Sequence, residues 1–218
     1  MRLWTIQGIE IYDQLVKDGV TYCTKPAWGD EENFMYAYHW MAEQMRKRIG
    51  EPPIEGIEYP LWAWYQYDSA KKNKPPRSPK DVSEGLSAYM EIELPEDQVL
   101  LSDFDEWHSP LNRGPVRNWR KIWKKIDSHD KNAGRSLDFM EYPQNLRQEI
   151  EDSWEGIFDL DIREKGVKHK RNRCVQATFW ALFPENIVSV EFLERKGDIV
   201  KPIKYKEKYE KEKSYTCL

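Results

Sequence analysis

Long apolar runs and a paired set of cysteines are both missing from this sequence of 218 residues. No apolar stretch approaches the ~20 residues that a helix needs to cross a bilayer. The opening MRLWTIQGIE does not place an apolar region after a basic one, as a secretion signal does. The three cysteines, Cys23, Cys174 and Cys217, form neither an even set nor a metal-binding pattern. We therefore expect no membrane partner, no disulfide framework and a cytoplasmic location.

The short motifs that mark common catalytic sites are also absent. The sequence contains no GxGxxG, no GxxxxGKS or GxxxxGKT, no HExxH, no CxxC and no GxSxG. Its four histidines, at positions 39, 108, 129 and 169, are not spaced as metal ligands. The Rossmann, P-loop, zincin and hydrolase classes therefore have no support, and we expect no metal.

What the sequence does contain favours a folded α+β protein. Charged residues make up 33%, but 10 Trp, 12 Tyr and 7 Phe supply bulky apolar side chains for a core. Period-two alternation predicts strands at Leu3–Ile6, Tyr59–Tyr67, Leu86–Leu94, Val99–Ser102, Cys174–Leu182 and Ile187–Leu193. Helical spacing predicts helices at Glu10–Lys17, with Gly19 as the stop, at Asn33–Ile49, and over much of Asp105–Asp152. The irregular order of these elements predicts one α+β domain over residues 1–200, followed by a charged C-terminal tail, 201–218.

One acidic cluster, SDFDEWH at Ser102–His108, follows a predicted strand. Asp103, Asp105 and Glu106 could cap the helix that begins there, because acids satisfy its free N–H groups and favour its dipole. They could also form the edge of a site that handles protons, or bind a metal together with His108.

Two predicted strands carry polar pairs on one face. Thr5 and Gln7 alternate with Ile6, and Gln176 and Thr178 lie on one face of CVQATFWAL. Such groups face solvent, pair with neighbours, or bind a ligand such as a nucleotide. Tyr65 and its neighbour Trp64 pose a similar choice between a place in the core and a ligand platform.

Two basic blocks, Arg113–Lys125 and Arg163–Arg173, stand out in a chain whose formal net charge is −4. They are either solvated surface or a groove for a polyanion. In the first block, Trp119 and Trp123 alternate with the basic residues. These tryptophans either stack on bases or form the core side of an amphipathic helix. The candidate nucleic-acid-binding residues are Arg117, Arg120, Lys121, Arg171 and Arg173.

Four segments, LWTIQ, YPLWAWYQY, VLLSDFDEWH and VQATFW, together resemble the domain-of-unknown-function 3841 family, over most of the chain to about residue 195. The order of elements is also similar, more distantly, to the DarT-like ADP-ribosyltransferases, toxins that use NAD to modify nucleic acid. That resemblance implies a split β-sheet with flanking helices and NAD as substrate. It further implies a nucleic acid or protein target, a toxin or anti-phage role, and an antitoxin protein as partner.

The same resemblance suggests roles for individual residues. The first-strand His and Thr of those transferases fall at Thr5 and Gln7, and their catalytic Glu falls at Thr178. Gln176 or Asp103 then has to act as the catalytic residue, with Thr5, Gln7, Tyr65 and Thr178 holding NAD. Because Thr178 can supply only a hydrogen bond, a catalytically inactive nucleotide- or partner-binding module of the same fold is the alternative. A metal-dependent nuclease built on the SDFDEWH acids is a third possibility.

Overall fold

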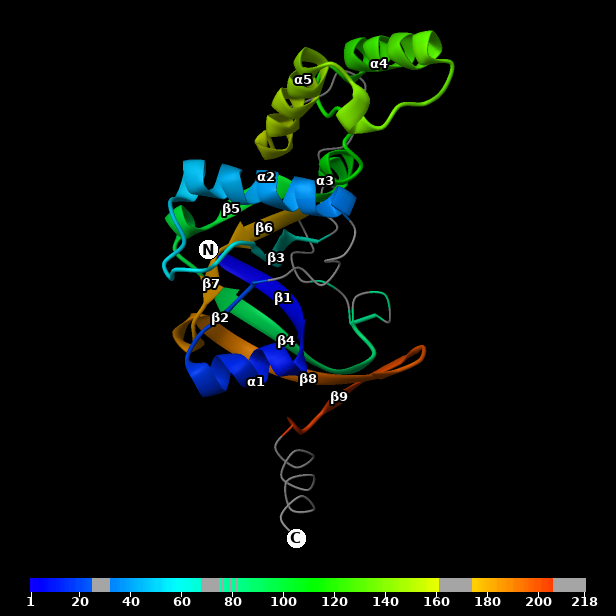
Figure 1. Ribbon diagram of the computed structural model, residues 1–218. Helices are drawn as coiled ribbons and strands as arrows, with labels where there is room; N and C mark the ends of the chain where they lie inside the picture. Colours follow the sequence, from blue (N-terminus) through cyan, green and yellow to red (C-terminus); the bar gives the residue numbers. More distant parts are fainter. Residues whose placement is uncertain are drawn as a thin grey trace.

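A seven-stranded antiparallel β-sheet lies at the centre of the computed structural model (Figure 1). The structure describes residues 1–24, 32–67, 75, 77, 78, 80, 82–160 and 174–205. The strand order is β5-β6-β3-β1-β4-β8-β9. The strands are β1 (Arg2–Gly8), β3 (Leu61–Gln66), β4 (Gly85–Glu93), β5 (Leu100–Asp103), β6 (Val175–Phe179), β8 (Ile187–Lys196) and β9 (Ile199–Ile203). A separate ribbon pairs β2 (Thr21–Tyr22) with β7 (Ala181–Leu182).

Five α-helices lie within the described residues. They are α1 (Ile9–Asp18), α2 (Glu32–Ile49), α3 (Phe104–Leu111), α4 (Trp119–Ala133) and α5 (Gln144–Trp154). The first helix ends at the predicted glycine. Gly19 adopts a left-handed φ of 74°, and its N–H donates to the Leu15 carbonyl at 3.0 Å.

Two hydrophobic cores cover opposite faces of the sheet. On one face, Leu15 of α1 packs among β1 and β4 residues that include Leu3 and Met90. On the other face, Met41 of α2 belongs to a core that also takes in Trp107 of α3 and residues of α4 and α5. The strand β6, which lies between β5 and β3, is buried along its whole length. Its polar side chains must therefore find partners inside the protein.

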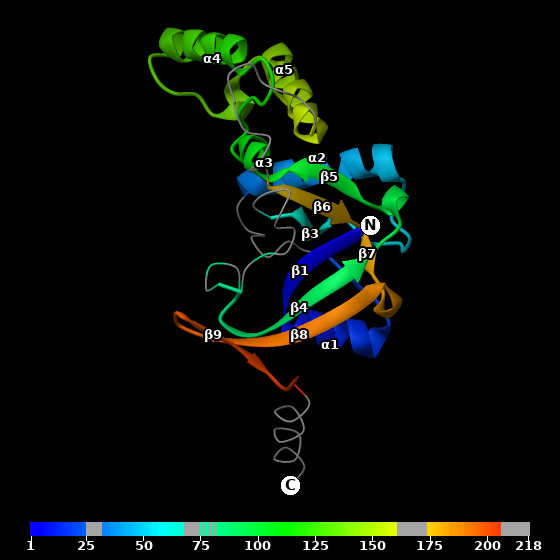
Figure 2. The same cartoon turned by 180° about the vertical axis from the view of Figure 1, so that it is seen from behind.

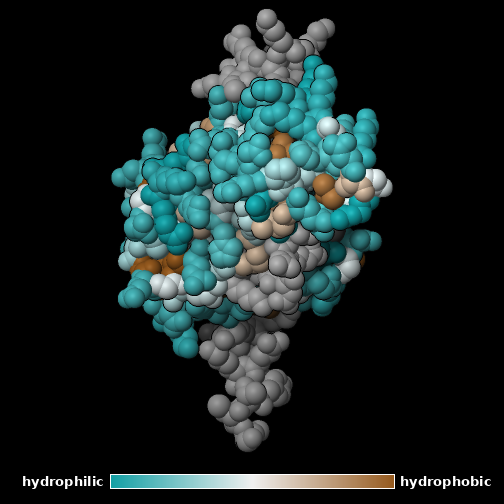
Figure 3. All heavy atoms as spheres, turned by 45° about the horizontal axis from the view of Figure 1, so that its top comes forward, coloured by the Kyte–Doolittle hydropathy of each residue, from teal (hydrophilic) through white to brown (hydrophobic). Residues whose placement is uncertain are grey.

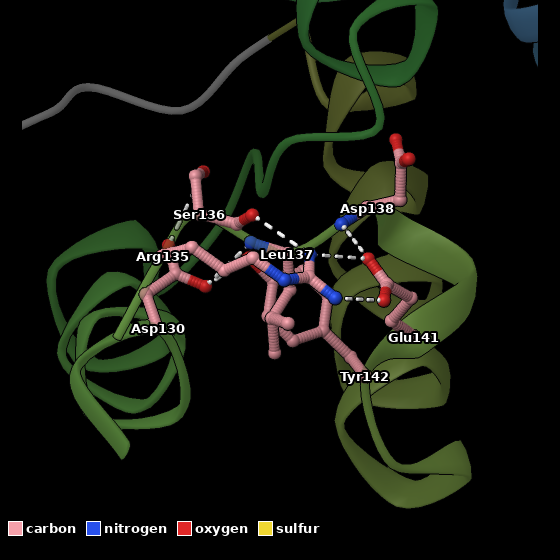
Figure 4. Close-up of polar contacts among 7 residues, drawn as sticks. All are labelled: Asp130, Arg135, Ser136, Leu137, Asp138, Glu141 and Tyr142. Carbon is pink, nitrogen blue, oxygen red and sulfur yellow. Dashed lines mark hydrogen bonds and ion pairs between the residues drawn. The ribbon is translucent and has the colours of Figure 1, made fainter. Parts of the chain in front are cut away.

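The helices α4 and α5 project beyond the sheet in both views (Figures 1 and 2). Asp130, near the end of α4, organises the connection between them (Figure 4). Its Oδ1 accepts from the Leu137 N–H at 3.1 Å and from the Tyr142 hydroxyl at 2.9 Å, and its Oδ2 accepts from the Ser136 hydroxyl at 3.4 Å. This carboxylate thus fixes the direction in which the chain leaves α4.

The strands β1 and β3 are neighbours in the sheet, but they are paired over a much shorter length than β1 and β4. The strand β1 is paired with β4 along its whole length, from Arg2 opposite Glu93 to Gly8 opposite Ser87. Between β1 and β3, in contrast, Trp4 opposite Trp64 is the one paired position among the described residues. The other residues of β1 have no paired position on β3 among the described residues.

The predicted α+β class is confirmed, and the six predicted strand regions all contain strands. The tail begins later than expected, because Lys201–Ile203 belong to β9, which pairs with β8. Residues 206–218 lie outside the described part. No helix within the described residues is both long and apolar enough to span a membrane. The face in Figure 3 is mostly hydrophilic, with small, separate hydrophobic patches.

Candidate functional site

A pocket of about 560 Å³ lies between β1 and β3, whose pairing is short. It draws residues from strands β1, β3 and β6, from helices α2 and α3, and from the segment before β4. The lining residues are Thr5, Ile6, Gln7, Tyr38, Trp62, Ala63, Trp64, Lys80, Phe104, Trp107, His108, Leu111 and Gln176. Its volume is within the range of about 300–1,000 Å³ that is typical of small-molecule sites.

The β1 wall of this pocket contains the predicted Thr5 and Gln7 pair. The Thr5 hydroxyl donates to the Trp62 carbonyl at 3.0 Å, across the gap between β1 and β3. The same hydroxyl accepts from Gln7 Nε2 at 2.7 Å. Within the described part of the chain, Gln7 Oε1 has no hydrogen-bond donor, so this oxygen can accept from a ligand.

On the β6 wall, Gln176 has a similar arrangement. Its side chain is 5% exposed, and Nε2 donates to the Ser102 hydroxyl of β5 at 3.2 Å. That contact fixes the orientation of the amide. Its Oε1 has no donor among the described residues, and like that of Gln7 it can accept from a ligand in the pocket.

Aromatic rings form most of the remaining wall. The ring centroids of Trp62 and Trp107 lie 5.3 Å apart, and those of Trp64 and Phe104 lie 4.8 Å apart. Tyr38 stands edge-on to Trp62. Burial raises the pKa of the Tyr38 hydroxyl, with the nearby Cys23 as a second cause. Tyr38 therefore remains a neutral phenol that can donate a hydrogen bond.

Two basic groups lie at the pocket. His108 Nδ1 faces the Phe104 carbonyl at 3.0 Å, which places its proton on Nδ1 and leaves Nε2 as an acceptor. Lys80 is exposed, and its ammonium has no ion pair within the described residues. The described lining contains no carboxylate. The formal charge of the described pocket lining is thus positive.

The acidic cluster before α3 is an N-terminal cap, which was one of the alternatives. Asp103 is buried, and its side chain accepts from the Glu106 N–H at 3.0 Å. Burial and the charge of Asp103 raise the pKa of Asp105. Glu106 pairs with Arg117 at 2.6 Å. Within the described residues, no group of His, Cys, Asp and Glu is arranged to hold a metal ion.

Among the predicted site residues, the structure brings Thr5, Gln7 and Gln176 to one pocket and leaves three others outside it. Tyr65 is 36% exposed and does not line the pocket; it lies where the register between β3 and β6 shifts, between Trp64 and Gln66. Thr178 is fully buried, and its hydroxyl donates to the Leu100 carbonyl at 3.2 Å. Asp103 caps α3. The expected convergence of Tyr65 and Asp103 on this pocket is therefore wrong.

The predicted basic residues have different environments. The guanidinium of Arg117 is held by Glu106 and by the Gly156 carbonyl at 2.7 Å, so little of its charge is available to a polyanion. Arg120 and Lys121 are exposed. Arg171 and Arg173, with the whole block 163–173, lie outside the described residues.

Several lining residues were not predicted from the sequence, namely Tyr38, Trp62, Lys80, Phe104, Trp107 and Leu111. Trp62 and Trp64 had one available signal, since they share the alternate positions of an aromatic strand. His108 was singled out as part of the acidic cluster. Nothing in the local pattern of α2 distinguishes Tyr38 from its core neighbours.

A second hollow, of about 410 Å³, lies between α4 and the segment that connects it to α5. Its carboxylate Asp130 accepts hydrogen bonds on both oxygens from the connecting segment (Figure 4). That carboxylate is committed to holding the fold, whereas the pocket between β1 and β3 presents acceptors that have no partner among the described residues. The latter is the better candidate site.

Fold and pocket together define an α+β protein with a seven-stranded antiparallel sheet and an aromatic, amide-bearing pocket. The model of the domain-of-unknown-function family DUF3841 matches residues 2–188, and the chain belongs to this family. The family membership expected from the sequence is thus confirmed. No curated protein and no solved structure matches the chain.

Proposed function

We propose that the protein binds a nucleotide, with NAD as the ligand, in the pocket between β1 and β3. The observation that carries the proposal is the combination of Trp64 with Gln176, which places an indole ring beside an oriented amide. A planar base or a nicotinamide ring stacks on an aromatic face, and such stacking contributes about 1–3 kcal/mol per base.

The polar groups of the pocket complement this aromatic wall. The Oε1 atoms of Gln7 and Gln176 accept from an exocyclic amine or a carboxamide N–H. The Tyr38 hydroxyl donates to a ring nitrogen or a carbonyl. The Lys80 ammonium provides a positive charge for a phosphate. These groups are suited to two parts of one nucleotide, namely the base or carboxamide and the phosphate.

ADP-ribosyl transfer is a second candidate function, and the position of His108 favours it. In this reaction the bond between nicotinamide and ribose C1′ breaks, and a bond from C1′ to the acceptor nucleophile forms. Nicotinamide leaves, and the acceptor proton moves to a base, for which His108 Nε2 is available. The described lining offers no carboxylate to stabilise the developing positive charge. Binding is therefore better supported than transfer.

The distant resemblance to NAD-using toxins extends the second candidate. On that basis the target is a nucleic acid or a protein, the role is that of a toxin or anti-phage component, and the partner is an antitoxin protein. A cytoplasmic location agrees with the three cysteines of the sequence, which form neither an even set nor a close-spaced pattern.

The two candidates are separated by titration and turnover. Calorimetry with NAD, ADP-ribose, AMP and nicotinamide mononucleotide tests binding, and saturable binding of NAD is expected. NAD labelled in its adenylate half, incubated with separate DNA, RNA and protein pools, tests transfer. Label on a pool together with free nicotinamide supports the transferase. Saturable binding without release leaves the binding module, and no binding of any of these nucleotides contradicts both.

A further inference from the structure

The first two turns of α4 carry a partly exposed aromatic and basic surface, in which Trp123 also lines the hollow of about 410 Å³. Trp119 is 43% exposed and Trp123 is 44% exposed, whereas Ile122 and Ile126 supply the buried side of the helix. The tryptophans are thus not the core residues of this helix. Four positions separate them, so they lie about 6 Å apart along the helix axis.

Basic side chains run parallel to the two tryptophans. Arg120 and Lys124 are also four positions apart, so they form a second row on the adjoining side of the helix. The Arg120 guanidinium lies 5.0 Å from the centroid of the Trp119 ring. We refer to Trp119, Arg120, Trp123 and Lys124 as the α4 face.

The charges of the α4 face are available to a partner. Within the described residues neither Arg120 nor Lys124 has an ion pair, whereas Lys125, on another side of the helix, pairs with Glu149. The first acid on this side is Asp127, which lies beyond Lys124. The positive dipole of the helix N-terminus adds to the same end of the helix.

We propose that the α4 face binds single-stranded nucleic acid. Exposed aromatic rings that follow one another along a positive surface suit successive unpaired bases and their phosphates. A duplex keeps its bases stacked inside, so its binding uses the cations but not the indole rings. A protein partner with the same apolar rings is the competing class, but two unpaired cations favour a polyanion. This surface is separate from the proposed nucleotide pocket and does not depend on it.

The test uses fluorescence anisotropy of labelled oligothymidylate, oligouridylate and a DNA duplex with the full chain at low salt. Trp119→Leu and Trp123→Leu keep apolar volume but remove the stacking plane. Each should weaken single-strand binding about 5- to 100-fold. The matching Phe variants should retain most of the affinity. Val16→Ala, at an exposed apolar position on α1, at the other end of the molecule, is the control.

Lys124→Gln keeps the test valid if a tryptophan variant fails to fold, because this side chain is exposed. On single strands it should reduce the slope of log K against log salt by about 0.7. Lys17→Gln on α1 is the matched control and should leave the slope unchanged. Three results overturn the proposal: no single-strand binding at low salt, tryptophan variants that bind like Val16→Ala, or a duplex bound as tightly as single strands. Absence of binding would leave the α4 face to a protein partner.

Discussion

Trp64 of β3 lies directly opposite Gln176 of β6, and both side chains line the pocket between β1 and β3. Opposed residues of an antiparallel pair share one face of the sheet, so this register brings the indole and the amide together. Ser102, the next partner across the sheet, holds the amide through its hydroxyl. Three strands therefore determine one contact surface for a ligand.

Removal of the Lys80 charge should distinguish phosphorylated ligands from nucleosides. Lys80→Gln is expected to weaken binding of AMP or NAD about 2- to 5-fold and to leave adenosine unchanged, because the lysine is exposed and such contacts contribute about 0.5–1 kcal/mol. Calorimetric titration measures this difference. Lys17→Gln on α1 removes the same charge far from the pocket and serves as control. An equal loss for adenosine would contradict a phosphate contact.

Substitution of Gln176 should weaken ligand binding, whereas substitution of Thr178 should lower stability. Gln176→Leu removes the acceptor that faces the pocket, and NAD affinity should fall about tenfold. Thr178→Val removes the hydrogen bond to the Leu100 carbonyl and should lower the free energy of unfolding by about 1 kcal/mol, with unchanged affinity. Urea unfolding and calorimetry on both variants provide the comparison. If Thr178→Val alone impairs binding, the assignment of these two residues is reversed.

Asp103 should act through the fold rather than through chemistry. Asp103→Ala removes the cap of α3 and should cost about 0.5–2 kcal/mol of unfolding free energy, whereas Asp103→Asn retains a good capping group and should cost much less. Thermal melting measures both. Should transfer activity be found, Asp103→Asn is expected to keep it. Loss of activity in a stable Asp103→Asn protein would make Asp103 catalytic.

The connection between α4 and α5 should weaken at high pH. Burial and the hydrogen bond to Asp130 raise the pKa of Tyr142 to about 12 from 10.0. A raised folded-state pKa means that the contribution is fully present below about pH 10 and is lost as the pH rises to about 12. At neutral pH Tyr142→Phe should therefore be about 1–2 kcal/mol less stable than the wild type.

That difference in unfolding free energy should shrink between about pH 10 and 12, and urea titrations at several pH values measure it. Tyr36, whose pKa is also raised to about 12, by burial and by Glu151, titrates over the same range in both proteins. The effect of Tyr36 therefore cancels in the difference in unfolding free energy between the wild type and Tyr142→Phe. A difference that stays constant up to pH 12 would show that the Tyr142 proton does not stabilise this connection.

Local patterns were sufficient for most elements of the fold. The helical spacing of Asn33–Ile49 predicted α2 to within a residue of its observed Glu32–Ile49. The strand β9 was missed, because Ile199–Ile203 includes Lys201 and Pro202, which are typical of an edge strand and weaken its apolar pattern. Pairing with β8 is a tertiary effect that such a pattern does not reveal.

The pocket was only partly predictable, for a reason that Tyr65 and Trp64 illustrate. Period-two alternation shows that neighbouring residues point to opposite faces but does not say which face will carry a cleft. The cleft lies between β1 and β3, and its lining comes from residues far apart in the sequence. Thr5, Gln7 and Gln176 were found because polar groups in buried strands require partners, whereas Tyr38 had no such signal.

The central claim is tested most directly by calorimetric titration of NAD into the wild type, Trp64→Leu and Tyr65→Leu. These two substitutions affect adjacent aromatic residues of one strand, but only Trp64 lines the pocket. We predict saturable binding to the wild type, unchanged binding to Tyr65→Leu, and a loss of about tenfold or more in Trp64→Leu. No NAD binding by the wild type, or an equal loss in both variants, would contradict the account.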